Sequence, residues 1–279
     1  MNLSLLIAGN LPKDWKDMSD SEKRLATALI AYVAGDAFGA FYEFTERTSE
    51  IPNVLRKKLD WPFGSTSDDT SLTLLTLLSL RARNVEESAK DFLTLIRQNQ
   101  SQLRGLGPTT RAALGLPVKD FEVNSIGLTN GAMMRTALLG LIFTERDERQ
   151  KWVRILSAST HREHGVDAAV ALADIFAGLV HLKGNVDPKD FKSGVSNDAN
   201  KTLDAVVYVA GCSSSVSEAI RLACSLGGDT DTVAALSAAL LASRNWNSTE
   251  LFTIPWLNDV DWTALELMSP ALESAFARL

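Results

Sequence analysis

Two stretches of the chain place hydroxyl and carboxylate side chains directly before a long apolar run. Residues 65–70 precede the run from Leu72 to Leu80, and residues 227–232 precede the run from Val233 to Leu241. A polar cluster that leads into a Leu- and Ala-rich run of this length is typical of a loop that begins an α-helix. Both stretches therefore predict helices with two acidic residues each near their N-termini.

A single Asp at a helix N-terminus is ordinarily a cap, because its oxygens accept hydrogen bonds from unpaired backbone N–H groups. Each cluster has more carboxylate than a cap needs: Asp68 and Asp69 in the first, Asp229 and Asp231 in the second. Neighbouring carboxylates repel unless a proton or a cation lies between them, and Mg²⁺ binds hard oxygen ligands of this kind. Capping is the alternative for either cluster alone, but their recurrence predicts a divalent-metal site.

A capping-box pattern at Ser19 predicts the start of another helix. Helical spacing along it brings Asp36 and Glu43 onto roughly the same face. The small residues between Gly35 and Ala40 would let another backbone or a ligand approach closely. In the alternative interpretation, this helix ends near Gly35 and Glu43 lies in an exposed turn.

The rest of the chain is predicted to form helices separated by loops rich in Gly, Pro and Asn, and alternating β-branched runs are scarce. We expect helices over 86–98, 166–182, 203–209, 217–226 and 264–278, with an exposed connection over 183–201. Trp246, Trp256 and Trp262 are expected to pack in the core. We predict an all-α fold in which residues 1–279 form a single compact multi-helix domain.

Charge and composition limit the classes of function. The chain carries 28 Lys and Arg against 34 Asp and Glu, and no dense basic cluster, which argues against binding of nucleic acid or an anionic membrane. No apolar run reaches membrane-spanning length, and no secretory signal is apparent. Cys212 and Cys224 lack the spacing of a metal or redox pair and are expected to be buried thiols. We therefore expect a cytoplasmic protein, by default a monomer.

Two further segments are candidates for ligand binding. The Gly-containing loop from Asn124 to Gly131 precedes an apolar run, and backbone N–H groups at such a helix start can bind phosphate. His161 and His164 could share a helix face, but no third soft ligand lies near them in the sequence, which argues against zinc. His161, beside Thr160, is the better pocket candidate, and His164 is expected at the surface.

Together these motifs resemble the ADP-ribosylglycohydrolase family, which includes the enzyme that reactivates dinitrogenase reductase and the hydrolases of ADP-ribosylarginine and ADP-ribosylserine. The matching motifs follow the family's order from about residue 25 to 243. They are Gly35-Asp36-Ala37-Phe38-Gly39 with Glu43, Ser67-Asp68-Asp69-Thr70, Asn130-Gly131-Ala132-Met133-Met134-Arg135, Thr160-His161 and Gly228-Asp229-Thr230-Asp231-Thr232.

The resemblance implies an all-α fold with two Mg²⁺ ions in a cleft, and hydrolysis of an ADP-ribosyl bond at the anomeric carbon of the ribose. The implied metal ligands are Ser67, Asp68, Asp69, Asp229, Asp231 and Thr232, with Ser67 where the family usually has Thr. The implied catalytic residues are Glu43, Asp68 and Asp231, and Asp36 is expected to be structural. The implied contacts to the ADP-ribosyl group are Gly127, Thr129, Asn130 and Gly131 at the phosphates and His161 on the ribose side.

Three other classes of protein fit the sequence less well. A catalytically inactive ADP-ribose-binding protein of the same fold would lack part of the acidic set, which is complete here. A terpene-synthase-like enzyme also binds Mg²⁺ through paired Asp residues, but the stretch from Asp68 to Leu72 lacks the last Asp of its DDxxD motif. A plain helical scaffold gives no reason to bury so many carboxylates.

The sequence leaves two points open. Glu43 fits either a general acid or base or a lid ligand that leaves when substrate arrives. The substrate side fits an arginine or serine linkage or a related conjugate, so the expected partner is an ADP-ribosylated protein or a small ADP-ribosyl compound. Mg²⁺ and Mn²⁺ are not distinguished.

Overall fold

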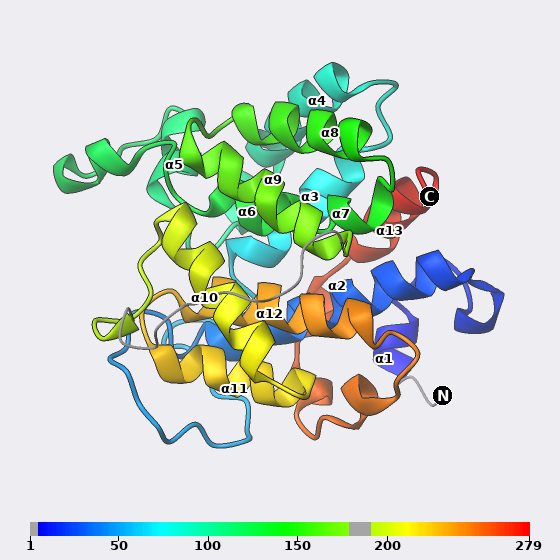
Figure 1. Cartoon of the computed structure of the whole chain (residues 1–279), viewed down its shortest axis with the longest axis vertical. Coiled ribbons are helices and arrows are strands. Elements are labelled where there is room, and N and C mark those ends of the chain that lie inside the picture. The colour runs from blue at the N-terminus through cyan, green and yellow to red at the C-terminus, as the bar shows by residue number, and fades with distance from the viewer. Residues whose placement is uncertain (1–4, 179–190) are drawn as a thin grey trace.

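The fold is described from a computed structural model, for residues 5–178 and 191–279 (Figure 1). It is all-α, as predicted: the described residues contain no β-sheet, only two isolated bridges between loops. The α-helices are α1 (Leu5–Ala8), α2 (Asp20–Gly39), α3 (Asp68–Ser79), α4 (Val85–Asn99), α5 (Pro108–Ala113), α6 (Gly131–Thr136), α7 (Leu139–Ile142), α8 (Arg146–Ala158), α9 (His164–Phe176), α10 (Ala199–Cys212), α11 (Val216–Leu226), α12 (Thr230–Arg244) and α13 (Met268–Phe276). Short 3-10 segments are η1 (Trp15–Asp17), η2 (Gln100–Gln102), η3 (Asp120–Ser125), η5 (Glu250–Thr253), η6 (Leu257–Asp259) and η7 (Trp262–Ala264).

Helices α2 and α12 pack against each other at the centre of the molecule (Figure 1). Every residue of α2 from Leu25 to Gly39 is buried, and so is every residue of α12 from Thr230 to Ser243. A helix that is apolar around its whole circumference belongs in the interior, because no face of it can be left to water. Helices α10 and α11 pack against α12 on one side, and α3 to α9 form the cyan-to-green layer on the other (Figure 1).

Two glycines of α2 allow this close packing. A Cβ on Gly35 would lie 2.5 Å from the carbonyl oxygen of Ala234, and one on Gly39 would lie 2.6 Å from the Cα of Asp231. The Thr230 hydroxyl also donates a hydrogen bond to the Gly39 carbonyl oxygen at 2.9 Å. The predicted close approach of another backbone is therefore confirmed, and Gly39 helps to set the position of Asp231.

Replacing Gly39 by alanine is expected to lower the free energy of unfolding by about 1–3 kcal/mol, because the added methyl group overlaps the α12 backbone. The effect is measured by urea unfolding. Gly107→Ala is the matched control, since a Cβ at Gly107 meets no described atom within 4 Å. Equal losses in the two variants would contradict the packing argument.

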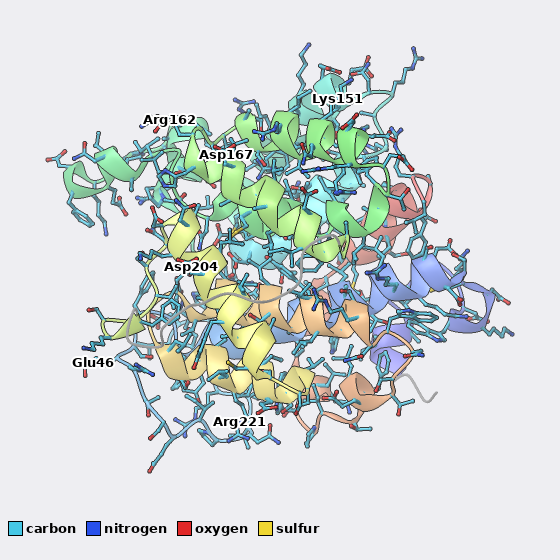
Figure 2. The ribbon with its side chains drawn as sticks, in the orientation of Figure 1. Glu46, Lys151, Arg162, Asp167, Asp204 and Arg221 are labelled. Atoms are coloured by element: carbon cyan, nitrogen blue, oxygen red, sulfur yellow. The ribbon has the colours of Figure 1, made fainter. Side chains whose placement is uncertain are left out.

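The apolar side chains of the described residues form one buried cluster that extends from Ile7 to Ala275. A single continuous core agrees with the predicted single domain, whose bounds stay a prediction. Charged side chains such as Lys151, Asp167 and Arg221 lie at the periphery (Figure 2). Within the described ranges, no helix is both long enough and apolar enough to cross a membrane.

The predictions for Trp and Cys are confirmed only in part. Trp256 and Trp262 are in the core, with 2% and 0% of their surface exposed, but Trp246 is half-buried. Cys224 is buried as expected, whereas Cys212 is exposed at the end of α10. The periodicity of the sequence does not distinguish these positions, because each lies near the end of an element.

Helix positions are predicted better than helix ends. The capping box at Ser19 is present and begins α2. Helix α10 begins four residues earlier than expected, because the Asp198 carboxylate accepts hydrogen bonds from the backbone N–H groups of Asn200 and Lys201. Helix α9 ends at Phe176, and the remainder of the helix expected to end at Leu182 lies, from residue 179 on, outside the described residues.

The expected exposed connection over 183–201 is confirmed in part for its described residues, 191–201: Lys192, Ser193, Ser196 and Asn197 are exposed, but Phe191, Val195 and Ala199 are buried. Residues 183–190 lie outside the described residues. Phe191 and Val195 are 1% and 4% exposed. The Val195 N–H donates to the Gly227 carbonyl oxygen, and the Val195 carbonyl oxygen accepts from the Asp229 N–H, both at 2.9 Å. Val195 is buried because its backbone pairs with the loop before α12, whereas most of its neighbours in the segment are exposed.

Candidate active site

A cavity of about 930 Å³ lies beside the N-termini of α3 and α12. Its lining brings together residues that are far apart in the sequence. Five of the six predicted metal ligands line it, together with Glu43; these residues are Glu43, Asp68, Asp69, Asp229, Asp231 and Thr232. Ser67 is the predicted ligand that is not part of this lining.

Ser67 has a different role that its position explains. It is the N-cap of α3, and its hydroxyl accepts a hydrogen bond from the Asp69 N–H at 3.1 Å. Because Ser67 caps the helix, the carboxylates of Asp68 and Asp69 are not needed for capping and can face the cavity, where their residues are 7% and 4% exposed. Capping alone therefore does not account for these two acidic residues.

Asp36 joins α2 to this turn. Its carboxylate, fully buried, accepts hydrogen bonds from the Ser67 N–H at 3.0 Å and from the Thr70 N–H and hydroxyl at 3.0 and 2.5 Å. Burial raises the pKa of Asp36, and the hydrogen bonds from Thr70 and Ser67 act in the opposite direction. These contacts agree with the expected structural role of Asp36.

Asp36→Ala is expected to destabilise the protein by about 2–4 kcal/mol, because it leaves three buried donors without an acceptor. It should also lower activity, since the turn that carries Asp68 and Asp69 is no longer held. Asp36→Asn keeps one carbonyl oxygen and is expected to lose less stability. Urea unfolding measures both variants, and a wild-type stability for Asp36→Ala would contradict this role.

The second acidic pair lies at the start of α12. Asp229 is the N-cap residue but its side chain makes no capping hydrogen bond; it accepts instead from the Asn130 amide, which also donates to the Thr202 hydroxyl at 2.9 Å. Asp231 accepts from the Thr232 N–H at 3.0 Å. Gly228 has φ +77°, and a Cβ there would lie 2.1 Å from the Val195 carbonyl oxygen, so only glycine fits the turn that presents this pair.

Glu43 is not placed as either interpretation of the sequence expected. Helix α2 continues past Gly35 but ends at Gly39, so Glu43 lies in the following turn, off the helix. Its side chain is nevertheless only 13% exposed and lines the cavity. One carboxylate oxygen each of Glu43, Asp229 and Asp231 lie within 4.8 Å of one another. The turn returns the chain to the second acidic pair, because the Phe44 N–H donates to the Gly228 carbonyl oxygen at 2.7 Å.

Crowding of the acids changes their protonation. Burial, followed by the charges of Asp36 and Glu43, raises the pKa of Asp68 to about 8. Burial and the neighbouring carboxylates also raise the pKa of Asp69 and of Asp231 well above the usual range. Asp69 Oδ2 is buried and has no hydrogen-bond partner among the described residues. Such an arrangement is costly without a compensating cation, so this donor set fits a hard divalent metal ion.

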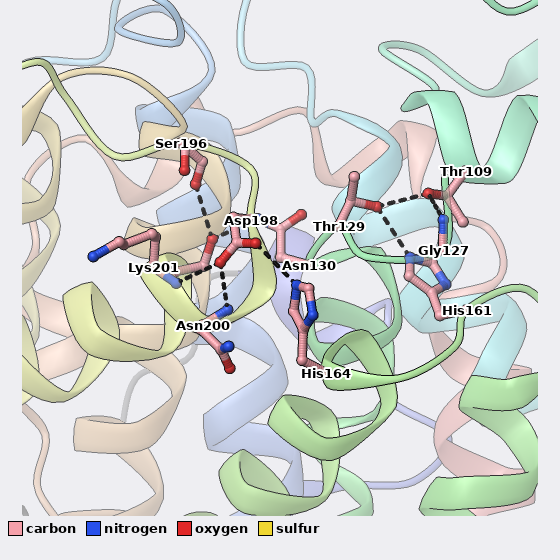
Figure 3. A network of polar contacts seen from close by, with 11 residues as sticks. Thr109, Gly127, Thr129, Asn130, His161, His164, Ser196, Asp198, Asn200 and Lys201 are labelled. Atoms are coloured by element: carbon pink, nitrogen blue, oxygen red, sulfur yellow. Dashed lines mark hydrogen bonds and ion pairs between the residues drawn. The ribbon is translucent and has the colours of Figure 1, made fainter. Parts of the chain in front are cut away.

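The predicted phosphate loop is only partly at the cavity. Thr129, Asn130 and Gly131 line it, but Gly127 and His161 do not. The Gly127 N–H donates to the Thr109 hydroxyl at 2.9 Å and is therefore already paired (Figure 3). Thr129 Oγ1 lies 2.9 Å from Thr109 Oγ1 and 3.2 Å from His161 Nε2. Gly127 and His161 therefore hold the loop in position through Thr109 and Thr129, without lining the cavity themselves.

His161 is buried and uncharged. Burial and the charge of Arg135 lower its pKa to about 3, and its Nδ1 lies 2.8 Å from Thr160 Oγ1. The two histidines do not share a helix face, since His161 precedes α9, which begins at His164. His164 lies at the surface, as expected, but is half-buried: its ring is 31% exposed, and Nε2 lies 2.9 Å from Asp198 Oδ2 (Figure 3).

Sequence reasoning missed several residues of the cavity. The segment from Gly105 to Arg111 lines one wall, and Lys58, Phe121 and Asn197 contribute from three other segments. The Gly and Pro residues of 105–108 predict a loop before a short helix, and this pattern could have indicated a cavity wall. Lys58, Phe121 and Asn197 carried no such signal, because their positions depend on the packing of distant segments.

Fold and site define an all-α protein with an acidic cavity beside two helix N-termini. A sequence model of the ADP-ribosylglycohydrolase family matches residues 17–201, so the chain belongs to this family. A solved structure described as "ADP-ribosylglycohydrolase-related protein complex" is similar in fold, with a TM-score of 0.67 and 24% identity over 93% of this chain and 99% of that chain. No curated protein matches this chain.

Proposed function

We propose that the protein is a Mg²⁺-dependent hydrolase that removes ADP-ribose from a modified side chain, or from a related conjugate, by cleaving the bond at the ribose anomeric carbon. Membership of a family of glycohydrolases supports the reaction class. The observation that carries the proposal is the convergence of Glu43 with two pairs of buried carboxylates on one cavity of about 930 Å³. A site of that size holds a ligand as large as ADP-ribose.

The proposed metal ligands are Asp68, Asp69, Asp229, Asp231 and Thr232, whereas the Ser67 hydroxyl caps α3 and does not line the cavity. Two bound Mg²⁺ ions would supply positive charge that orients ribose hydroxyls and lowers the pKa of a water molecule. The unpaired Asp69 oxygen supports this assignment, because it is a buried acceptor that a cation would satisfy.

The remaining residues bind and position the substrate. Thr129, Asn130 and Gly131 face the cavity and are proposed to contact the diphosphate, with His161 holding Thr129 in place. A Glu43 carboxylate oxygen lies within 4.8 Å of oxygens of Asp229 and Asp231, and Glu43 is proposed to transfer a proton at the scissile bond. Positive charge develops at the anomeric carbon in such a reaction, and the carboxylates favour it.

The test is release of ADP-ribose from matched arginine-linked and serine-linked ADP-ribosyl peptides, each with Mg²⁺ and with EDTA. Metal-dependent release from one peptide supports the proposal and identifies the linkage. Binding of ADP-ribose without release from either peptide would point to an inactive binding protein of the same fold. If the protein neither releases ADP-ribose from the peptides nor binds free ADP-ribose, the proposal is overturned.

A further inference from the structure

Lys58 brings a positive charge to the acidic cavity. Its ammonium forms an ion pair with Glu43 Oε2 and lies 4.3 Å from the centre of the Trp61 ring. The side chains of Lys58 and Glu43 are 25% and 13% exposed, and both residues line the cavity. The pair is therefore shielded from water in part, which makes its interaction stronger than that of a surface ion pair.

The other basic residues of the described cavity lining have partners elsewhere. Arg111 Nη2 lies 2.7 Å from Glu122 Oε2, and Lys119 Nζ lies 5.5 Å from the centre of the Phe121 ring. Neither of these contacts involves an acid of the predicted metal centre. Among the basic residues of the described lining, it is therefore Lys58 that forms an ion pair with Glu43.

The segment that carries Lys58 is held at both sides of this lysine. Residues 45–67 contain no helix, and Leu55 is buried in the core at 6% exposure. On the other side, the Trp61 ring lies against the cavity wall, since a Cβ on Gly105 would be 3.8 Å from Trp61 and 3.2 Å from Asp68 Oδ1. Lys58 is therefore directed to Glu43 by anchored neighbours.

We propose that Lys58 is an internal counterion of Glu43, and that it competes with a bound cation for the Glu43 carboxylate. This inference rests on the proposed metal centre. A Glu43 oxygen lies within 4.8 Å of oxygens of Asp229 and Asp231, so the same carboxylate can face either a cation among these acids or the Lys58 ammonium. In the metal-free protein Lys58 holds Glu43; metal binding has to separate the pair.

The test compares Lys58→Met with the wild-type protein, because methionine keeps an apolar stem over Trp61 and removes the charge. Binding of Mn²⁺ alone is measured by calorimetry, and the thermal midpoint is measured in EDTA. Lys58→Met is expected to bind Mn²⁺ about tenfold more tightly, which equals about 1.4 kcal/mol, and to melt at a lower temperature in EDTA. Lys58→Arg keeps the charge and the wild-type affinity; Lys57→Met, at an exposed neighbour, changes neither value.

A Glu43→Gln background separates this role from a general effect of charge. If Lys58 acts by holding Glu43, Lys58→Met produces no further gain in that background, whereas an equal gain in both backgrounds would overturn the proposal. Unchanged or weaker Mn²⁺ binding by Lys58→Met, with normal binding by the wild-type protein, would overturn it and leave the metal centre intact. Absence of Mn²⁺ binding by both proteins would overturn the two proposals together.

Discussion

Replacing Asp231 by alanine is expected to abolish release of ADP-ribose, with a loss of about a thousandfold or more. Asp231 lies in the first turn of α12, 3% exposed, and one of its oxygens is within 4.8 Å of oxygens of Glu43 and Asp229. Its removal leaves the proposed metal centre without a central ligand. Activity is measured with the peptide that the wild-type protein cleaves.

The variant is expected to keep its helical circular dichroism, because α12 is held by the apolar residues from Val233 to Leu241 and not by the Asp231 side chain. Asp147→Ala is the matched control: Asp147 also lies in the first turn of a helix, α8, but is exposed. Full activity in Asp231→Ala, or an equal loss in Asp147→Ala, would refute the assignment of Asp231 as a metal ligand.

In the metal-free protein, the free energy of unfolding is expected to decrease as the pH rises from 6.5 to 8. The pKa of Asp68 is raised from 3.8 to about 8, so the folded protein keeps a proton that the unfolded chain has released. The folded state then binds more protons, and its stability decreases with pH until the folded pKa is reached. One such group contributes about 1.4 kcal/mol for each pH unit, or about 2 kcal/mol over this window.

The raised pKa of Asp69 and of Asp231 acts in the same direction. His161 acts in the opposite direction, but only below pH 6.5, because its pKa is lowered from 6.5 to about 3. Thermal midpoints are therefore measured from pH 6.5 to 8 in EDTA and in Mg²⁺. A bound cation supplies the missing positive charge, so the decline should be smaller in Mg²⁺ and in Asp68→Asn. Equal slopes in all three samples would contradict this account.

Local signals were sufficient to predict most of the longer helices and two of their N-termini, although α8 (Arg146–Ala158) was not among the predicted helices. At Ser19 and at Ser67 before α3, the side chain accepts a hydrogen bond from a backbone N–H within the same turn. Such caps depend on local sequence and not on distant parts of the chain. Within the 183–201 connection, the burial of Val195 was not predicted because it depends on hydrogen bonds to Gly227 and Asp229, which are more than 30 residues away. No local pattern records such a partner.

The all-α class, the acidic residues of the two helix N-termini and the small residues that allow α2 to approach α12 could be predicted from local patterns in the chain. Which of these acids lie close together depends on how the helices pack. Glu43 faces Asp229 and Asp231 because the turn after α2 returns to the loop before α12, and Lys58 and His161 take their roles from neighbours that are distant in the chain. Spacing along the sequence sets directions within one helix, whereas distances between helices are set by the packing of their side chains.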